Sequence, residues 1–297
     1  NSINALSYKN SNYIINNDVH SYIAELNSIF SSRVSNSFSV GYTANRDYRS
    51  SNSSVIPLID ILDGSNNQYI SLGYEPFTPN NTLNTDVSQF QDNLTFYLNN
   101  HTLTAGVNYE TFAFDNLFTP TFYGQYVFNN INDFKNALNG DSVALRRYAL
   151  NYSALPNQEL PWATTKVQMP GAYLQDEISL LNNKLSLTVG VRIDVPIFAE
   201  TALRNVLVDT MKFKDENGNI VNYGTNKLPN KQYMFSPRLG FNYDVMGNRK
   251  LQVRGGTGVF TGRPPFVWIS NVVGNNGVLQ GSITQDNTNT KKYKFSN

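Results

Sequence analysis

The stretch "KLSLTVGVRIDV", residues 184–195, alternates between apolar and polar side chains. The apolar set is Leu185, Leu187, Val189, Val191, Ile193 and Val195, and the set between them is Lys184, Ser186, Thr188, Gly190, Arg192 and Asp194. Because successive strand side chains point to opposite faces, the stretch predicts a β-strand with one apolar and one polar face. In a soluble sandwich the apolar face points into the core, whereas in a membrane barrel it points outward to lipid. The orientation of this face therefore decides the class of protein.

The composition favours the membrane alternative. Only 15% of the residues are charged, against a typical share of about 25%, while 13% are aromatic, with 18 Tyr and 18 Phe. Chains that place rings at a boundary between lipid and water have this character. The net charge of +1 leaves no basic surface for nucleic acid, so nucleic acid is excluded as a partner.

Catalytic and cofactor chemistry has little support. The chain has no cysteine, which excludes disulfides, thiolate zinc sites and thiol nucleophiles. Its two histidines, His20 and His101, lack metal-site spacing, and no "GxSxG" elbow is present. The glycines of "RGGTG" (254–258) lack the Lys-Ser/Thr pair of a phosphate loop. We therefore expect no metal, no cofactor and no enzymatic activity.

The ends and the apolar runs give further bounds. No apolar run approaches the roughly 18 residues that a membrane-spanning helix needs, so spans of that kind are excluded. The chain begins with Asn1 and shows no signal peptide. We expect both ends to be cut edges of a longer protein.

Alternating segments recur along the chain and are joined by connections of two kinds. They predict eight strands, near 20–31, 36–48, 86–98, 101–114, 169–181, 184–195, 232–245 and 249–260. Tight turns are expected at Asn99-Asn100, Asn182-Asn183 and "MGNR" (246–249). Long segments lie at 49–85, 115–162, 196–231 and from 261 onward. Short turns at one end and long loops at the other are typical of an outer-membrane barrel.

Some long segments carry local signals. "QYISLGY" (68–74) is predicted to extend the sheet, and "NINDFKNALNG" (130–140) to form a short helix that ends at Gly140. The carboxylates of "KDENGNIV" (214–221) suggest calcium, but a type I′ turn at Asn217-Gly218 is the favoured interpretation.

One residue departs from the alternation. In "AYLQDEISLL" (172–181), Asp176 shares a face with apolar residues, and a carboxylate facing lipid at mid-depth is unfavourable. A bulge, or a strand end outside the hydrocarbon, would remove the conflict.

Two neighbouring hairpins resemble those of a known family. "AYLQDEISLLNNKLSLTVGVRIDVP" and "FSPRLGFNYDVMGNRKLQVRGGTGVFTGRPP" are similar to adjoining hairpins of TonB-dependent outer-membrane receptors, particularly the carboxypeptidase-regulatory-like, Oar-type and SusC-like branches. The matching residues are Tyr173, Gln175, Asp176, Glu177, Leu185, Leu187, Gly190, Arg192, Asp194, Ser236, Pro237, Arg238, Gly240, Arg254, Gly255, Gly256, Gly258 and Phe260. The resemblance implies an all-β fold, an antiparallel transmembrane β-barrel with short periplasmic turns and long extracellular loops.

The same resemblance implies that residues 1–297 form part of one 22-stranded barrel domain, whose plug domain and remaining strands are not visible here. It implies uptake of a glycan, peptide or chelate through a plugged barrel. The implied partners are outer-membrane lipid, the protein's own plug, a TonB-type energy-coupling protein and, as in SusC-like relatives, a surface lipoprotein. Two alternatives stay open: a porin-like or structural outer-membrane barrel without energy coupling, and a secreted β-rich adhesin.

Candidate site residues fall into two sets. The polar faces of the strands would enclose the lumen and face the plug, through Arg192, Asp194, Arg238, Asp244 and Arg254. A solvated or salt-bridged structural role is the competing interpretation for this set. Ligand binding is predicted for aromatic and arginine side chains of the long loops, namely Tyr123, Tyr126, Trp162, Arg263, Phe266 and Trp268. For Trp162 and Trp268 an interfacial aromatic girdle is the competing interpretation.

Overall fold

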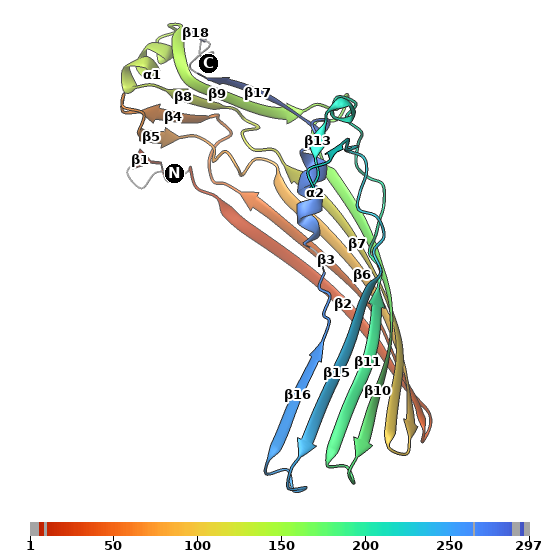
Figure 1. Cartoon of the computed structure of the whole chain (residues 1–297). Coiled ribbons are helices and arrows are strands. Elements are labelled where there is room, and N and C mark those ends of the chain that lie inside the picture. The colour runs from red at the N-terminus through yellow and green to blue at the C-terminus, as the bar shows by residue number, and fades with distance from the viewer. Residues whose placement is uncertain (1–5, 9–10, 264, 287–291, 294–297) are drawn as a thin grey trace.

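The computed structural model describes residues 6–8, 11–263, 265–286 and 292–293 of the chain. Two large sheets account for most of the fold, a tall curved sheet and a smaller sheet beside one of its ends (Figure 1).

The curved sheet contains the predicted strands. Its strands follow the order β16-β15-β11-β10-β7-β6-β3-β2. All neighbours are antiparallel, and a short strand, β12 (Ile197–Phe198), also pairs with β10. The bounds are β2 (Ile14–Ser31), β3 (Val34–Ser50), β6 (Asn81–Leu98), β7 (His101–Phe118), β10 (Ala163–Leu180), β11 (Leu185–Asp194), β15 (Met234–Asp244) and β16 (Gln252–Gly258). The eight predicted strands are therefore confirmed.

The tight turns lie where the sequence placed them. Leu98 pairs with His101 across Asn99-Asn100, and Asn99 has a φ of 47°. Asn182 and Asn183 have φ of 53° and 67° between β10 and β11. Asn adopts this left-handed region more readily than most residues, which explains its place in these turns.

Several strands extend further than predicted at the end opposite the tight turns. β6 begins at Asn81, β7 continues to Phe118 and β10 begins at Ala163. In β10 the prediction stopped short because the polar face becomes apolar there, with the buried Ala163 and Val167 in place of polar residues. The loss of alternation reflects a second covering layer on this face.

Strands of the first, second and last long segments, together with β1 near the N-terminus, form the smaller sheet. Its order is β1-β5-β4-β8-β9-β17, with β18 also paired to β9. The bounds are β1 (Leu6–Ser7), β4 (Leu58–Leu62), β5 (Gln68–Leu72), β8 (Gln125–Phe128), β9 (Val143–Ser153), β17 (Gln280–Asp286) and β18 (Lys292–Tyr293). We name these strands the loop sheet. The prediction that residues 68–74 extend the main sheet is wrong, because β5 pairs with β4 and β1 instead.

A helix completes the core of the loop sheet. α1 (Ile131–Leu138) confirms the predicted helix, and its N-cap Asn130 accepts hydrogen bonds from the backbone N–H groups of Asn132 and Asp133. Gly140, with a φ of 87°, follows its C-terminus. The buried core comprises Ile59, Ile61, Phe128, Ala137, Val143 and Leu145.

A small hairpin forms in the third long segment, after a 3₁₀ turn at Val208–Thr210. β13 (Phe213–Lys214) pairs with β14 (Ile220–Val221), but the turn is not type I′ as predicted. Gly218 has a φ of 82°, whereas Asn217 does not have a positive φ, and the N–H of Asp215 donates to the carbonyl of Asn219. Asp215 instead begins a turn in which its carbonyl accepts a hydrogen bond from the N–H of Gly218, and Gly218 adopts the left-handed region.

Asp176 does not lie at a bulge. β10 pairs without a register shift on both sides, and Asp176 Oδ2 lies 2.7 Å from Nδ1 of His101, the first residue of β7. This position, close to the turn end of both strands, agrees with the strand-end interpretation.

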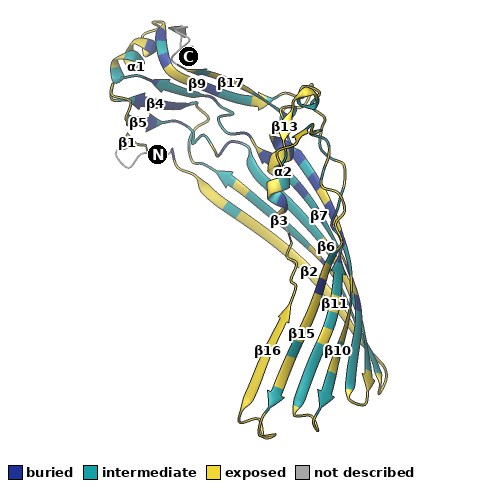
Figure 2. Cartoon of the chain, viewed as in Figure 1, coloured by how far each residue is buried: buried dark blue, intermediate teal, exposed yellow. Residues whose placement is uncertain are grey.

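The apolar face of the curved sheet is not sealed inside the protein. Val191 and Phe241 are 47% and 41% exposed, and Leu187 is half-buried. Buried positions gather in the loop sheet and in the part of β7 and β10 close to it (Figure 2). The opposite, polar face carries the second layer.

Candidate lumenal site

The chain after β16 folds back across the polar face of the curved sheet. Its helix α2 (Phe266–Gly274) packs on β7 and β10 (Figure 1). The ring of Phe266 lies 5.1 Å from that of Phe112 and 5.5 Å from that of Phe114. Val167 and Met169 of β10 complete this buried cluster. The apolar residues at this end of the polar face therefore form the surface on which α2 packs.

Polar contacts hold the segment before α2. Arg263 forms a salt bridge with Glu110 of β7, and its guanidinium lies 5.2 Å from the centre of the Phe112 ring. The hydroxyl of Thr261 lies 3.0 Å from that of the fully buried Ser236 on β15. We name residues 259–263 and 265–274 the inward segment.

A polar cavity of about 400 Å³ lies between the inward segment and the sheet. The side chains that line it include Gln89, Gln91, Asn108, Glu110, Arg192, Asp194, Arg238 and Arg263. Amides, carboxylates and guanidinium groups together suit a polar ligand with several hydrogen-bonding groups.

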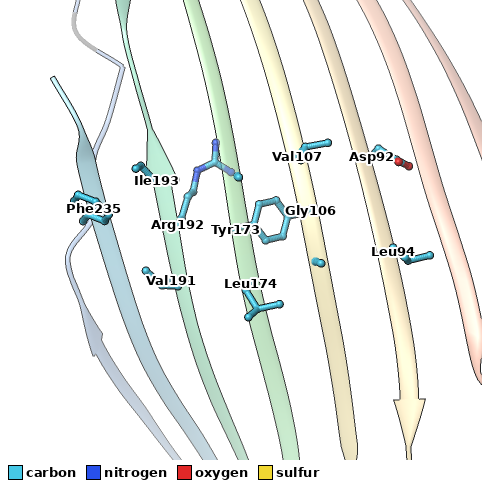
Figure 3. Close-up of a pocket in the computed structure, with 12 residues that line it drawn as sticks. Asp92, Leu94, Gly106, Val107, Tyr173, Leu174, Val191, Arg192, Ile193 and Phe235 are labelled. Atoms are coloured by element: carbon cyan, nitrogen blue, oxygen red, sulfur yellow. The ribbon is translucent and has the colours of Figure 1, made fainter. Parts of the chain in front are cut away.

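The wall beside the cavity is ordered by side-chain contacts. Arg192 donates to both carboxylate oxygens of the buried Asp194, each at 2.7 Å, and its guanidinium lies 5.7 Å from the centre of the Tyr173 ring. The hydroxyl of Tyr173 donates to the side chain of Asn93. Figure 3 shows the Tyr173 ring beside Gly106 and Arg192 reaching from β11 toward β10.

The predicted lumen set divides into paired and unpaired groups. Arg192 and Asp194 pair with each other. Asp244 accepts hydrogen bonds from the backbone N–H groups of Gly247 and Arg249, so it orders a turn. In the described part of the chain, Arg238 and Arg254 form no salt bridge, and the Arg238 guanidinium lies 4.8 Å from the centre of the Phe260 ring.

The predicted loop set is not brought together at one place. Tyr123 contacts Tyr74, with ring centres 5.2 Å apart, beside the loop sheet. Tyr126 in β8 packs on Tyr148, and burial raises the pKa of Tyr126. The half-buried Trp162 precedes β10.

The remaining members of the loop set belong to the inward segment. Arg263 lines the cavity, and Phe266 is enclosed by side chains of the sheet. Trp268 is 70% exposed on α2. Since α2 lies on the polar face of the sheet, Trp268 is separated from the apolar face where an interfacial girdle would lie.

Sequence reasoning missed Gln89, Gln91 and Glu110 as site residues. The signal was present, because they occupy the polar positions of β6 and β7 that alternate with Phe90 and Tyr109. The alternating pattern does not predict that residues 261–263 fold back onto these strands.

The described residues hold no group of three or more His, Asp or Glu side chains placed to bind a metal ion. Among the same residues, no helix combines the length and apolarity needed to cross a bilayer.

Comparison with known proteins identifies the family to which this fold belongs. The model of the outer membrane beta barrel domain matches residues 1–297, so the chain belongs to that family. It is similar in fold to the outer membrane transporter YddB from Escherichia coli, with 15% identity and a TM-score of 0.56 over 92% of this chain and 29% of that one. A second match is P. aeruginosa FpvA bound to heterologous pyoverdines, with 14% identity and a TM-score of 0.33 over 84% of this chain and 29% of that one. No protein of curated function matches the sequence.

The chain therefore forms part of the wall of an outer-membrane β-barrel. It spans less than a third of the length of these two solved proteins. Its apolar face contacts lipid and its polar face lines the lumen, with short periplasmic turns and long extracellular segments.

Proposed function

We propose that this chain is the barrel part of a TonB-dependent receptor that takes up a polar ligand across the outer membrane. The observation that carries the proposal is the polar cavity between the lumenal wall and the inward segment. A structural barrel has no need of a polar cavity on its inner wall, whereas a ligand in transit needs polar groups that replace its water.

The loop sheet supports a capture role. It joins strands from separate long segments into one unit with a buried core at the extracellular end. Binding surfaces are commonly built on such excursions from a rigid scaffold. Tyr126 lies in β8 of the loop sheet, Tyr123 lies just before it, and Trp162 precedes β10. In this proposal these residues would meet the ligand first, and Trp268 and Arg263 would meet it next.

Energy coupling is inferred from the paired hairpins that resemble Oar-type and SusC-like receptors. In such a receptor a plug fills the lumen and contacts the unpaired cations of the wall, Arg238 and Arg254. A TonB-type protein would displace the plug, and a surface lipoprotein would cover the loops. No bond is made or broken in this mechanism.

Conductance of the full-length protein tests the proposal. In planar bilayers a plugged receptor stays closed, whereas a porin-like barrel without energy coupling conducts ions continuously. If the full-length protein conducts ions continuously, no plug closes its lumen, and the receptor proposal is wrong. The outer-membrane family assignment already separates the chain from a secreted adhesin.

Uptake of the ligand by cells is a second test of the proposal. Ligand-dependent growth should be lost when the energy-coupling protein is deleted or the proton gradient is collapsed. Growth that persists without coupling would favour the porin-like alternative.

A further inference from the structure

The lipid-facing wall contains an apolar groove of about 530 Å³ (Figure 3). Two parallel rows of paired residues form it. One row runs through Asp92, Val107, Ala172, Ile193 and Phe235, and the other through Leu94, Ala105, Leu174 and Val191. The methyl groups of Ala105 and Ala172 leave the space between their larger neighbours.

The groove has the length of an extended chain. The first row crosses five adjacent strands, from β6 to β15. At a spacing of about 4.8 Å between strands, this corresponds to about 19 Å. Val107, Leu174 and Val191 remain half-exposed, so side chains of the protein do not fill it.

One end of the groove carries a carboxylate that faces hydrocarbon. Asp92 shares the outer face of β6 with Phe90 and Leu94, one on each side of it along the strand. Asn36 of β3 donates to Oδ1 of Asp92 at 2.6 Å. The second oxygen, Oδ2, accepts no hydrogen bond from any residue that the structure describes.

A carboxylate in this position is costly unless hydrogen-bond donors reach it. A saturated chain would fill the groove and leave Oδ2 facing hydrocarbon. A chain with a hydroxyl group would fill the groove and donate to that oxygen. The apolar rows and the acidic end therefore select for the same ligand.

We propose that this groove binds the acyl chain of an outer-membrane lipid that carries a hydroxyl group on the chain. The alkyl part lies along the two rows, and the hydroxyl donates to Asp92. The site lies on the lipid face and is independent of the lumenal path proposed above.

Native mass spectrometry of the full-length protein tests the site. The purified protein is exchanged into detergent with equal amounts of two synthetic lipids, one with β-hydroxymyristoyl chains and one with myristoyl chains. We expect retention of the hydroxylated lipid to be about tenfold higher, the effect of one hydrogen bond to a charged group. Equal retention of the two lipids, or retention of neither, would overturn the proposal.

Variants locate the binding. Asp92→Leu removes the acceptor, so the two lipids should be retained equally. Ala172→Leu fills the groove and should abolish retention of both, with Ala105→Leu as a second variant on the neighbouring strand. Leu239→Phe, on the same apolar face outside the groove, should match the parent protein. A preference that survives Asp92→Leu, or retention that survives both alanine variants, places the lipid elsewhere. Heat-modifiable migration on gels confirms that each variant is folded.

Discussion

The aromatic ring of Tyr173 on β10 lies across Gly106 on β7, in the space that a side chain at position 106 would occupy. A Cβ atom there would overlap the ring, whose hydroxyl donates to Asn93 of β6. One side chain therefore joins three strands on the lumenal face, and the glycine is the condition for this contact.

Gly106→Ala should destabilise the barrel by about 1–3 kcal/mol, because the ring must leave its position and its hydrogen bond. Gly240→Ala is the matched control, since its Cβ would lie at an ordinary 3.8 Å from Thr188 on the same face. Urea unfolding of the protein in lipid vesicles measures both. Equal midpoints for the two variants would contradict the role assigned to Gly106.

Phe266→Ala should release α2 from the wall. The ring is buried among Phe112, Phe114 and Val167, and removal of a buried Phe side chain costs about 3–5 kcal/mol. Because the loss is local, hydrogen exchange of residues 265–274 should rise while the strands stay protected. Trp268→Ala, at a residue 70% exposed, should leave this exchange unchanged. Unaltered protection in Phe266→Ala would show that other contacts hold the helix.

The Arg263–Glu110 salt bridge should couple the inward segment to the wall. A double-mutant cycle with Arg263→Gln and Glu110→Gln should give a coupling free energy of about 1 kcal/mol, because the Arg263 side chain is exposed whereas that of Glu110 is only 13% exposed. If the cavity lies on the uptake path, each single variant should also change uptake of the ligand. A coupling of zero would mean that the segment is held by its apolar contacts alone.

Two extracellular turns should loosen in acid. The Asn67 side chain and nearby backbone N–H groups lower the pKa of Asp63, and Asn219 lowers the pKa of Asp215 in the same way. A lowered folded-state pKa means that the stabilisation is complete above the ordinary value of 3.8 and is lost as the pH falls through the folded value. Carboxyl resonances followed by NMR should titrate below 3.8 in both turns. Asp63→Asn should abolish the transition in its own turn only.

The strands and their orientation in the membrane could be predicted because apolar and polar residues alternate wherever one face of a strand contacts only lipid and the other only the lumen. Leu187 and Val191 face lipid while Thr188 and Arg192 face the lumen, so period two is visible in the sequence. At the extracellular end Phe112 and Phe114 meet α2, and the pattern changes there. The same change at Val167, which packs in this cluster, explains why β10 was predicted to begin at 169 instead of 163.

The site was predicted only in part, because its contacts join residues far apart in the chain. Arg263 meets Glu110 across 153 positions, and nothing local to either residue indicates the other. Arg192 and Arg238 were placed on the lumenal face by alternation alone. Asp92 was overlooked because a single acidic residue in an apolar face resembles an irregularity.

The pairing within the loop sheet restricts how the extracellular surface can change in evolution. β4, β8 and β17 come from three different long segments, and each pairs through main-chain hydrogen bonds with a strand of another segment: β4 with β8, and β17 with β9. A change of length in one excursion must then be matched in its neighbours. New specificities are expected to arise by exchange of the whole extracellular unit or by replacement of its outward side chains, rather than by free variation of single loops.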